Sequence, residues 1–107
     1  YSGEGGRLGG SAHRTRVLEA SKYIQGKGGN IISGGGNSEA RVSIPGQNNY
    51  RYPDIHAQIN NENIFVQVGR TTSSGKMVSR EMAAFTDLSK LGRTYYAPYD
   101  QPFRGFM

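Results

Sequence analysis

The segment 52–68 constrains the fold of this chain more than any other feature, because it has the pattern of two strands joined by a tight turn. Residues 52–59 (YPDIHAQI) alternate between apolar and polar side chains, which is typical of a half-buried strand. The Asn60-Asn61 pair favours a hairpin turn, and residues 64–68 (IFVQV) predict a strongly apolar second strand. We therefore expect a β-hairpin with an apolar face that packs on a helix.

Helical spacing flanks this hairpin on both sides. Residues 12–25 place apolar and small side chains on one helical face and end at a glycine-rich segment, and Ser11 is suited to cap that helix. Residues 77–91 carry apolar side chains at positions i, i+4, i+7 and i+10 and end before Gly92. Further short strands are expected over residues 30–33, 39–44 and 93–99, and the tail 100–107 is aromatic and irregular.

These elements predict an α+β fold with a mixed β-sheet of four to five strands and two helices on its faces, in the order α-β-β-β-α-β. Residues 1–11 are glycine-rich and lack periodicity, so we expect a flexible linker there and a single domain over residues 12–107. A chain of 107 residues is long enough for one modest hydrophobic core and too short for two ordinary domains.

Composition excludes several classes of protein. The chain has no cysteine, which excludes zinc sites with thiolate ligands and disulfide scaffolds. It has no run of 18 apolar residues, so we expect no membrane span, and its amino end lacks the apolar region of a signal peptide. Thirteen Lys and Arg against eight Asp and Glu give a net charge of +5. The basic residues are singly spaced, which favours a folded cationic face for an anionic partner, above all nucleic acid.

Asp54 and His56 lie two residues apart on the first predicted strand of the hairpin, so both belong to its polar face, which is either solvated or a site. Gln67 is the only polar residue of the second strand, and a buried amide has to be hydrogen-bonded. A hairpin symmetric about residues 60–62 brings Asp54 or His56 opposite Gln67 or its neighbours. A register shift of one residue reverses the faces.

The loop 70–76 (RTTSSGK) joins a strand to a helix, as phosphate-binding loops do. It lacks the Walker spacing, because Arg70 stands where the first glycine is required and Met77 follows Lys76 where Ser or Thr is required. The sequence therefore excludes this type of nucleotide site. The hydroxyls and cations of the loop still suit a nucleic-acid phosphate, although an ordinary hydrophilic connection has the same composition.

The order of elements, with Pro53-Asp54 opening a strand, is similar to the core of the PD-(D/E)xK nucleases. In that family the Asp binds a metal ion, and an acidic residue two positions before a Lys follows on the next strand. Here Gln67-Val68-Gly69 stands in place of that second motif, without its carboxylate and lysine. Metal chemistry is therefore kept as an alternative, with Asp54 and Glu19 as the candidate ligands of a divalent metal.

More broadly, residues 52–88 and the glycine-rich segment ahead of them resemble the C-terminal toxin modules of bacterial polymorphic toxins, which include contact-dependent growth inhibition toxins. The resemblance implies a nuclease, often acting on tRNA, and a cognate immunity protein that neutralises it. For some members it also implies cooperation with elongation factor Tu. It further implies a protein that is secreted or delivered from a cell surface and acts in the cytoplasm of the target cell.

A metal-independent ribonuclease is the first function we expect, because RNA carries its own nucleophile, the 2′-hydroxyl group. Cleavage then needs a base, an acid and cations for the charge that develops on the phosphate. We expect His56 to be the base or acid, Asp54 to orient it and Arg70 to bind the phosphate in a bidentate manner. The other expected site residues are Gln67 and Thr72 in the catalytic group, and Thr71, Lys76, Arg80 and Arg51 on the nucleic-acid backbone.

Two other functions stay open. One is a metal-dependent DNase or RNase of the PD-(D/E)xK type, and the other is a basic nucleic-acid-binding module without catalysis. His13, at the start of the first helix, is expected to be solvated. Tyr95, Tyr96 and Tyr99 suit either base stacking or packing of the sheet and tail.

Overall fold

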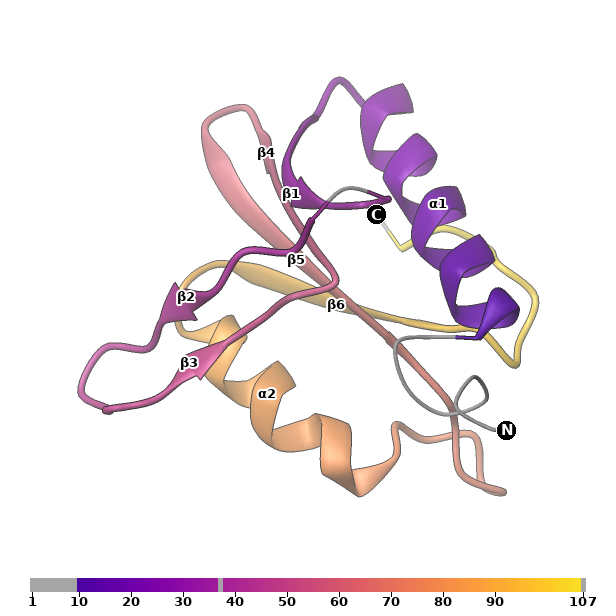
Figure 1. Cartoon of the computed structure of the whole chain (residues 1–107). Coiled ribbons are helices and arrows are strands. Elements are labelled where there is room, and N and C mark those ends of the chain that lie inside the picture. Colours follow the sequence, from indigo (N-terminus) through magenta and orange to yellow (C-terminus); the bar gives the residue numbers. More distant parts are fainter. Residues whose placement is uncertain (1–9, 37, 107) are drawn as a thin grey trace.

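Figure 1 shows the computed structural model, which describes residues 10–36 and 38–106. Over these residues the chain forms two helices, a four-stranded mixed sheet and a small two-stranded sheet, which confirms the α+β fold. The elements are α1 (Ser11–Gly26), β1 (Asn30–Gly34), β2 (Val42–Ser43), β3 (Tyr50–Arg51), β4 (Ile55–Ile59), β5 (Glu62–Gly69), α2 (Ser79–Ser89) and β6 (Arg93–Pro98).

The main sheet has the strand order β1-β4-β5-β6. β1, β4 and β5 pair in antiparallel fashion, and β6 runs parallel to β5 after the crossover through α2. The β4–β5 hairpin is the one predicted from the sequence, and it pairs Ile55 with Val66. Its turn residues Asn60 and Asn61 have φ angles of 54° and 68°, the left-handed backbone that asparagine tolerates better than most residues.

α1 and α2 cover opposite faces of the main sheet. α1 packs on the face to which the alternate residues Ile64, Val66 and Val68 of β5 point, and this contact forms the hydrophobic core. Phe65 points to the other face, where α2 contacts β5 and β6. The buried residues that complete the core on the α1 side are Val17, Ala20, Ile24, Ile55, Ala57 and Ala97.

The small sheet is a feature that the sequence only partly predicts. Within the expected strand 39–44, only Val42 and Ser43 form β2, and they pair with β3, whose residues Tyr50 and Arg51 lie just before the expected start of the hairpin. The turn between the two strands contains Pro45-Gly46. The result is a short arm that projects from the side of the main sheet next to α2 (Figure 1).

The ends of the helices differ from the prediction by a few residues. α2 begins two residues later than expected, because Met77 pairs with Thr71 in a β-bridge and Val78 keeps an extended backbone. Ser11 is the first residue of α1 and does not cap it; Gly10 holds the cap position without a side-chain hydrogen bond. The linker expected over residues 1–11 lies outside the described residues apart from these two.

Both helices begin at the same end of the main sheet (Figure 1). α2 returns the chain from the end of β5 to the start of the parallel strand β6, so its first turn lies where β5 ends. The first turn of α1 lies at that end as well. Helix amino termini carry partial positive charge, so this end of the fold favours acidic groups and anions. Neither helix in the described part of the chain combines the length and hydropathy that crossing a bilayer requires.

Candidate functional site

Asp54 lies immediately before β4, at the end of the sheet where both helices begin, and each of its polar atoms has a partner. Its main-chain N–H donates to Gln67 Oε1 at 2.9 Å, and the N–H of Val68 donates to Asp54 Oδ2 at 2.7 Å. Its carbonyl oxygen accepts the N–H of Gly35 at 3.1 Å. Asp54 Oδ1 lies 3.5 Å from Nε2 of His13. The carboxylate is therefore held in one position by its surroundings.

The approach of β1 to Asp54 requires a glycine. Gly34 has a φ of +73°, and a Cβ atom at this position would lie 2.0 Å from the carbonyl oxygen of Asp54. The turn through Gly35 then lets its N–H reach the same carbonyl oxygen. The glycine-rich segment after β1 is thus part of what fixes Asp54.

Gln67 has the environment predicted from the sequence. It is 7% exposed, and its side-chain oxygen accepts the hydrogen bond from Asp54. The expectation of a buried and hydrogen-bonded amide opposite the start of the hairpin is therefore confirmed.

Three further titratable side chains surround Asp54. His13 is the third residue of α1, Glu81 is the third residue of α2, and Glu39 belongs to the segment after β1. We call Asp54, His13, Glu39 and Glu81 the Asp54 site. The side chains of His13 and Asp54 are 19% and 14% exposed, so these two groups are largely desolvated but still open to a ligand.

The groups of the Asp54 site shift one another's pKa. Glu39 is exposed as a residue, but partial burial of its carboxyl group, the charge of Asp54 and a hydrogen bond with Asp54 raise its pKa to about 7. The hydrogen bond to Asp54 raises the pKa of His13 above 6.5, against the effect of burial. Burial and the charge of Asp54 also raise the pKa of Glu81. The site therefore holds one carboxyl group, Glu39, with a pKa near neutrality, beside an imidazole and a second carboxyl group whose pKa values are raised.

The sequence does not single out these flanking residues. His13 was expected to be solvated, and this prediction is wrong, because the residue lies between Asp54 and the ring of Tyr99, whose centroid is 6.1 Å from that of His13. Glu39 and Glu81 were not among the expected site residues. One sequence signal points to His13 and Glu81: each is a titratable residue at the third position of a helix. The partial positive charge of a helix amino terminus acts on such a residue.

His56 lies away from this site. Its ring stacks on Phe65 with 4.6 Å between the centroids, and its Nε2 lies 3.0 Å from Oδ1 of Asn63. β-pairing puts His56 opposite Phe65. Arg70 follows Phe65 by five residues, so Arg70 is about 16 Å from the level of His56 along the strand. The structure thus does not bring His56 and Arg70 together on one phosphate. Asp54 does not orient His56 either, since its oxygens contact other partners.

The predicted phosphate loop is closed on itself. Thr72 accepts the main-chain N–H of Lys76 at 3.3 Å and shares a 3.0 Å hydrogen bond with Ser74. Thr71 donates its N–H and its hydroxyl group to the carboxylate of Asp100, at 3.0 and 3.1 Å. The carboxylate of Asp100 thus occupies the position at Thr71 where a phosphate was expected.

Several cations remain on the surface near this end of the fold. Arg70 directly follows β5, Lys76 ends the loop and Arg80 lies in the first turn of α2, and all three residues are exposed. Arg80 directly precedes Glu81, and its positive charge acts against the rise in the pKa of Glu81. These residues can attract a phosphate backbone toward the Asp54 site.

Two other expected site residues have structural partners elsewhere. Glu19 forms an ion pair with Arg16 at 2.8 Å. Glu19 follows His13 by six residues, so the two positions are about 9 Å apart along the helix axis. Arg51 forms an ion pair with Asp87 of α2, also at 2.8 Å. Among the described residues, no group of three or more His, Asp or Glu side chains is arranged to hold a metal ion.

The three tyrosines of β6 and the tail pack within the fold. Tyr95 stacks on Phe106 with 4.9 Å between ring centroids, and Tyr96 donates its hydroxyl proton to the carbonyl oxygen of Arg70 at 2.7 Å. Burial raises the pKa of Tyr96. With Tyr99 against His13, these contacts favour packing over base stacking for the three tyrosines.

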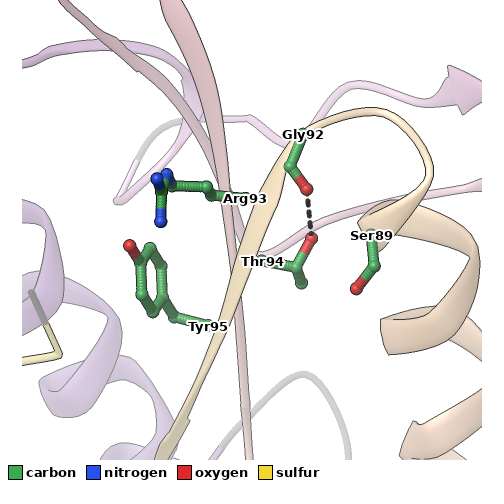
Figure 2. Close-up of a pocket in the computed structure, with 5 residues that line it drawn as sticks. All are labelled: Ser89, Gly92, Arg93, Thr94 and Tyr95. Atoms are coloured by element: carbon green, nitrogen blue, oxygen red, sulfur yellow. Dashed lines mark hydrogen bonds between the residues drawn. The ribbon is translucent and has the colours of Figure 1, made fainter.

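A depression of about 410 Å³ lies at the opposite end of β6 (Figure 2). Arg93 and Tyr95 lie on one side of the strand, and Thr94 and Ser89 lie on the other. Arg93 pairs with Glu62 at 3.3 Å, and the lining residues include no carboxylate or imidazole. This depression therefore lacks the carboxyl and imidazole groups that the Asp54 site holds.

Neither the protein-family models nor the curated proteins nor the solved structures give a match to this chain. The function has to be inferred from the geometry of the site.

Proposed function

We propose that the chain is a ribonuclease domain that cleaves RNA by metal-independent acid–base chemistry at the Asp54 site. The observation that best supports this proposal is the position of Asp54. It is fixed by the backbone of β5, and it contacts both a carboxyl group, Glu39, and an imidazole, His13. A carboxyl group and an imidazole with raised pKa values, both on one fixed carboxylate, are suited to act as a base and an acid.

Glu39 is the base in this proposal. With a pKa of about 7, a large share of the Glu39 carboxyl groups is ionised at neutral pH. The carboxylate takes the proton of the 2′-hydroxyl group, whose oxygen attacks the adjacent phosphorus. The P–O5′ bond breaks, and once the leaving oxygen has taken a proton the products are a 2′,3′-cyclic phosphate and a 5′-hydroxyl group.

His13 is the acid. Its Nε2 faces Asp54, so Nδ1–H is the group that donates a proton to the leaving 5′-oxygen. Asp54 keeps its negative charge, stabilises the imidazolium form and fixes the orientation of the ring. This assignment gives His13 the role that the sequence suggested for His56.

The cations near the site provide the remaining requirement. Three carboxyl groups alone repel a phosphate, so binding depends on Arg70, Lys76 and Arg80 and on the partial positive charge of the two helix termini. The net charge of +5 favours the same class of partner. Lys76 and Arg80 thus keep the backbone-binding role expected from the sequence.

A metal-dependent DNase or RNase is the second candidate function. It is favoured by the proximity of the Asp54 charge to Glu39 and Glu81, because a divalent cation would relieve the repulsion among these groups. Both oxygens of Asp54 already contact His13 or Val68, so this function requires the site to rearrange.

The narrower parts of the proposal depend on the resemblance to polymorphic toxins. They are a tRNA substrate, delivery from a secreted or cell-surface protein into the target-cell cytoplasm, a cognate immunity protein and cooperation with elongation factor Tu. Activity on purified tRNA with and without cell extract tests the substrate and the need for a helper.

The central experiment uses one oligonucleotide sequence, made as RNA and as DNA, with and without a chelator. We expect cleavage of the RNA in the presence of EDTA, with 2′,3′-cyclic phosphate ends, and no cleavage of the DNA. Loss of RNA cleavage on chelation, restored by added Mg²⁺, would reject metal independence and support the second candidate. Binding of both oligonucleotides without cleavage under any condition would leave a basic binding module.

A further inference from the structure

The β2–β3 arm has a strict alternation of exposure that its length does not require. In β3 and the residues after it, Tyr50 is exposed, Arg51 is half-buried, Tyr52 is exposed and Pro53 is buried. Arg51 faces α2, where it pairs with Asp87. The two tyrosine side chains therefore belong to the other face of the arm, which faces away from α2.

The two rings on this face are among the exposed large hydrophobic side chains of the described residues. Tyr50 is 47% exposed and Tyr52 is 57% exposed. The exposed part of each ring is not covered by the fold, and two such rings on one strand face form an aromatic patch that a ligand can cover. Residues two apart on a strand are about 7 Å apart, roughly twice the 3.4 Å spacing of stacked bases.

Arg41 completes this face. Because Val42 pairs with Arg51, Arg41 lies across from Tyr52 on the neighbouring strand. Its guanidinium carbon lies 4.3 Å from the centroid of the Tyr50 ring. A planar cation over an aromatic ring extends the stack and adds positive charge to it.

The arm leads directly into the Asp54 site. Tyr52 is followed by the buried Pro53 and then by Asp54, whose backbone and carboxylate are fixed. Arg51 and Gln47 attach the arm to α2 through Asp87, at 2.8 and 3.2 Å. The exposed rings thus have a stable position close to the residue on which the proposed chemistry depends.

We propose that Arg41, Tyr50 and Tyr52 form a stacking surface for the unpaired bases of single-stranded RNA, next to the scissile phosphate. The inference rests on the proposed function, because it places the bound strand beside the Asp54 site. The chemistry of the face favours this ligand. Its aromatic rings and guanidinium stack on any base, and the chain is cationic, whereas paired bases are already stacked and not accessible.

The experiment measures binding separately from cleavage. The probe is a fluorescein-labelled RNA of 12 nucleotides with a 2′-O-methyl group at every position, which the proposed chemistry cannot cut. It is used as a single strand and as a duplex with its complement. A second version carries 2-aminopurine, whose fluorescence falls when the base stacks on an aromatic ring.

We expect Tyr52→Ala to weaken binding of the single strand by about tenfold, because stacking of one base contributes on that order. The quenching of 2-aminopurine should fall with it. Binding of the duplex should change by less than about twofold. Tyr52→Phe, which keeps the ring, should bind like the parent, and so should Leu18→Ala, which removes an exposed apolar side chain of α1.

The inference would be overturned by unchanged binding of the single strand by Tyr52→Ala, or by an equal loss for single strand and duplex. A parent chain that binds no oligonucleotide would also overturn it and indicate a protein-docking face. The outcome is separable from that of the proposed function. Loss of single-strand binding in Tyr52→Ala, from a parent that cleaves no RNA, would support the stacking surface and reject the ribonuclease.

Discussion

Asp54 and Gln67 extend the β4–β5 hairpin by side-chain contacts. The main-chain N–H of Asp54 donates to the side-chain oxygen of Gln67, and the Asp54 carboxylate accepts the N–H of Val68, the residue after Gln67. Two side chains thus take the place of backbone pairing where β4 has not yet begun. This reciprocal arrangement orients the Asp54 carboxylate, and it depends on a side-chain acceptor at position 67.

Gln67→Leu should destabilise the fold and disturb the site together. The substitution leaves the N–H of Asp54 without its partner in a desolvated position, which costs about 1–3 kcal/mol. Chemical denaturation measures this cost. Gln58→Leu is the matched control, because Gln58 is an exposed glutamine of β4, and it should have a much smaller effect. Equal stability of the two variants would show that the Asp54–Gln67 pair does not contribute to the fold.

The two histidines of the chain give a direct comparison of the two candidate sites. His13→Ala should lower kcat for RNA cleavage by about 100-fold or more, because it removes the proposed acid. His56→Ala should retain most of the activity, since that ring stacks on Phe65 and lies apart from Asp54. Circular dichroism checks that both variants fold. The reverse result, with activity lost only in His56→Ala, would move the catalytic site to the polar face of β4.

RNA cleavage should have a bell-shaped dependence on pH. The proposed base Glu39 has to be ionised, so activity should fall as pH decreases below about 7. His13 has to be protonated, and its pKa is raised above 6.5, so activity should fall again as pH rises through the pKa of His13. Because these groups interact through Asp54, the two apparent pKa values belong to the cluster rather than to single residues.

Glu39→Gln tests which group causes the acidic limb. The variant keeps the size of the side chain but cannot accept the proton, so kcat should fall by about 10²–10⁴-fold and the residual activity should lose its acidic limb. Initial rates across the pH range, measured with excess substrate, give both quantities. An acidic limb that persists unchanged in Glu39→Gln would assign it to another group, and Glu81 is the next candidate.

The hairpin could be predicted because its information is local. The alternation in 52–59, the Asn60-Asn61 turn and the apolar run in 64–68 each specify a structure within a few residues. The β2–β3 arm could not be predicted in full, because two-residue strands have no periodicity to detect. The arm is held instead by Asp87, which lies 36 residues from its partner Arg51.

The candidate site shows the same difference between local and distant information. Asp54 and Gln67 share one hairpin, so their proximity follows from its register. His13 and Glu81 reach Asp54 only because two helices begin at the same end of the sheet, which depends on tertiary packing. His56 was favoured in the sequence because of its chemistry, although the same register puts Phe65 opposite it, and the two rings stack.

Asp87 should be important for the position of the arm. It is buried on α2, with its side chain 10% exposed, and it accepts hydrogen bonds from Arg51 and Gln47. The hydrogen bonds from Arg51 and then Gln47 lower the pKa of Asp87 below 3.8. Asp87→Asn should therefore lower the thermal unfolding temperature and weaken the single-strand binding assigned to the arm. Lys90→Met is the matched control, because Lys90 reaches the same carboxylate at 3.7 Å from an exposed position.

The contribution of Asp87 to stability should depend on pH. A carboxyl group whose pKa is lower in the folded than in the unfolded chain stabilises the fold above the unfolded pKa, here 3.8, and this contribution is lost as pH falls through the folded pKa. The difference in unfolding temperature between the parent and Asp87→Asn should thus be constant above that range and shrink at more acidic pH. Thermal unfolding over a pH series measures it. A difference that stays constant down to the lowest pH would show that Asp87 contributes by shape and not by its charge.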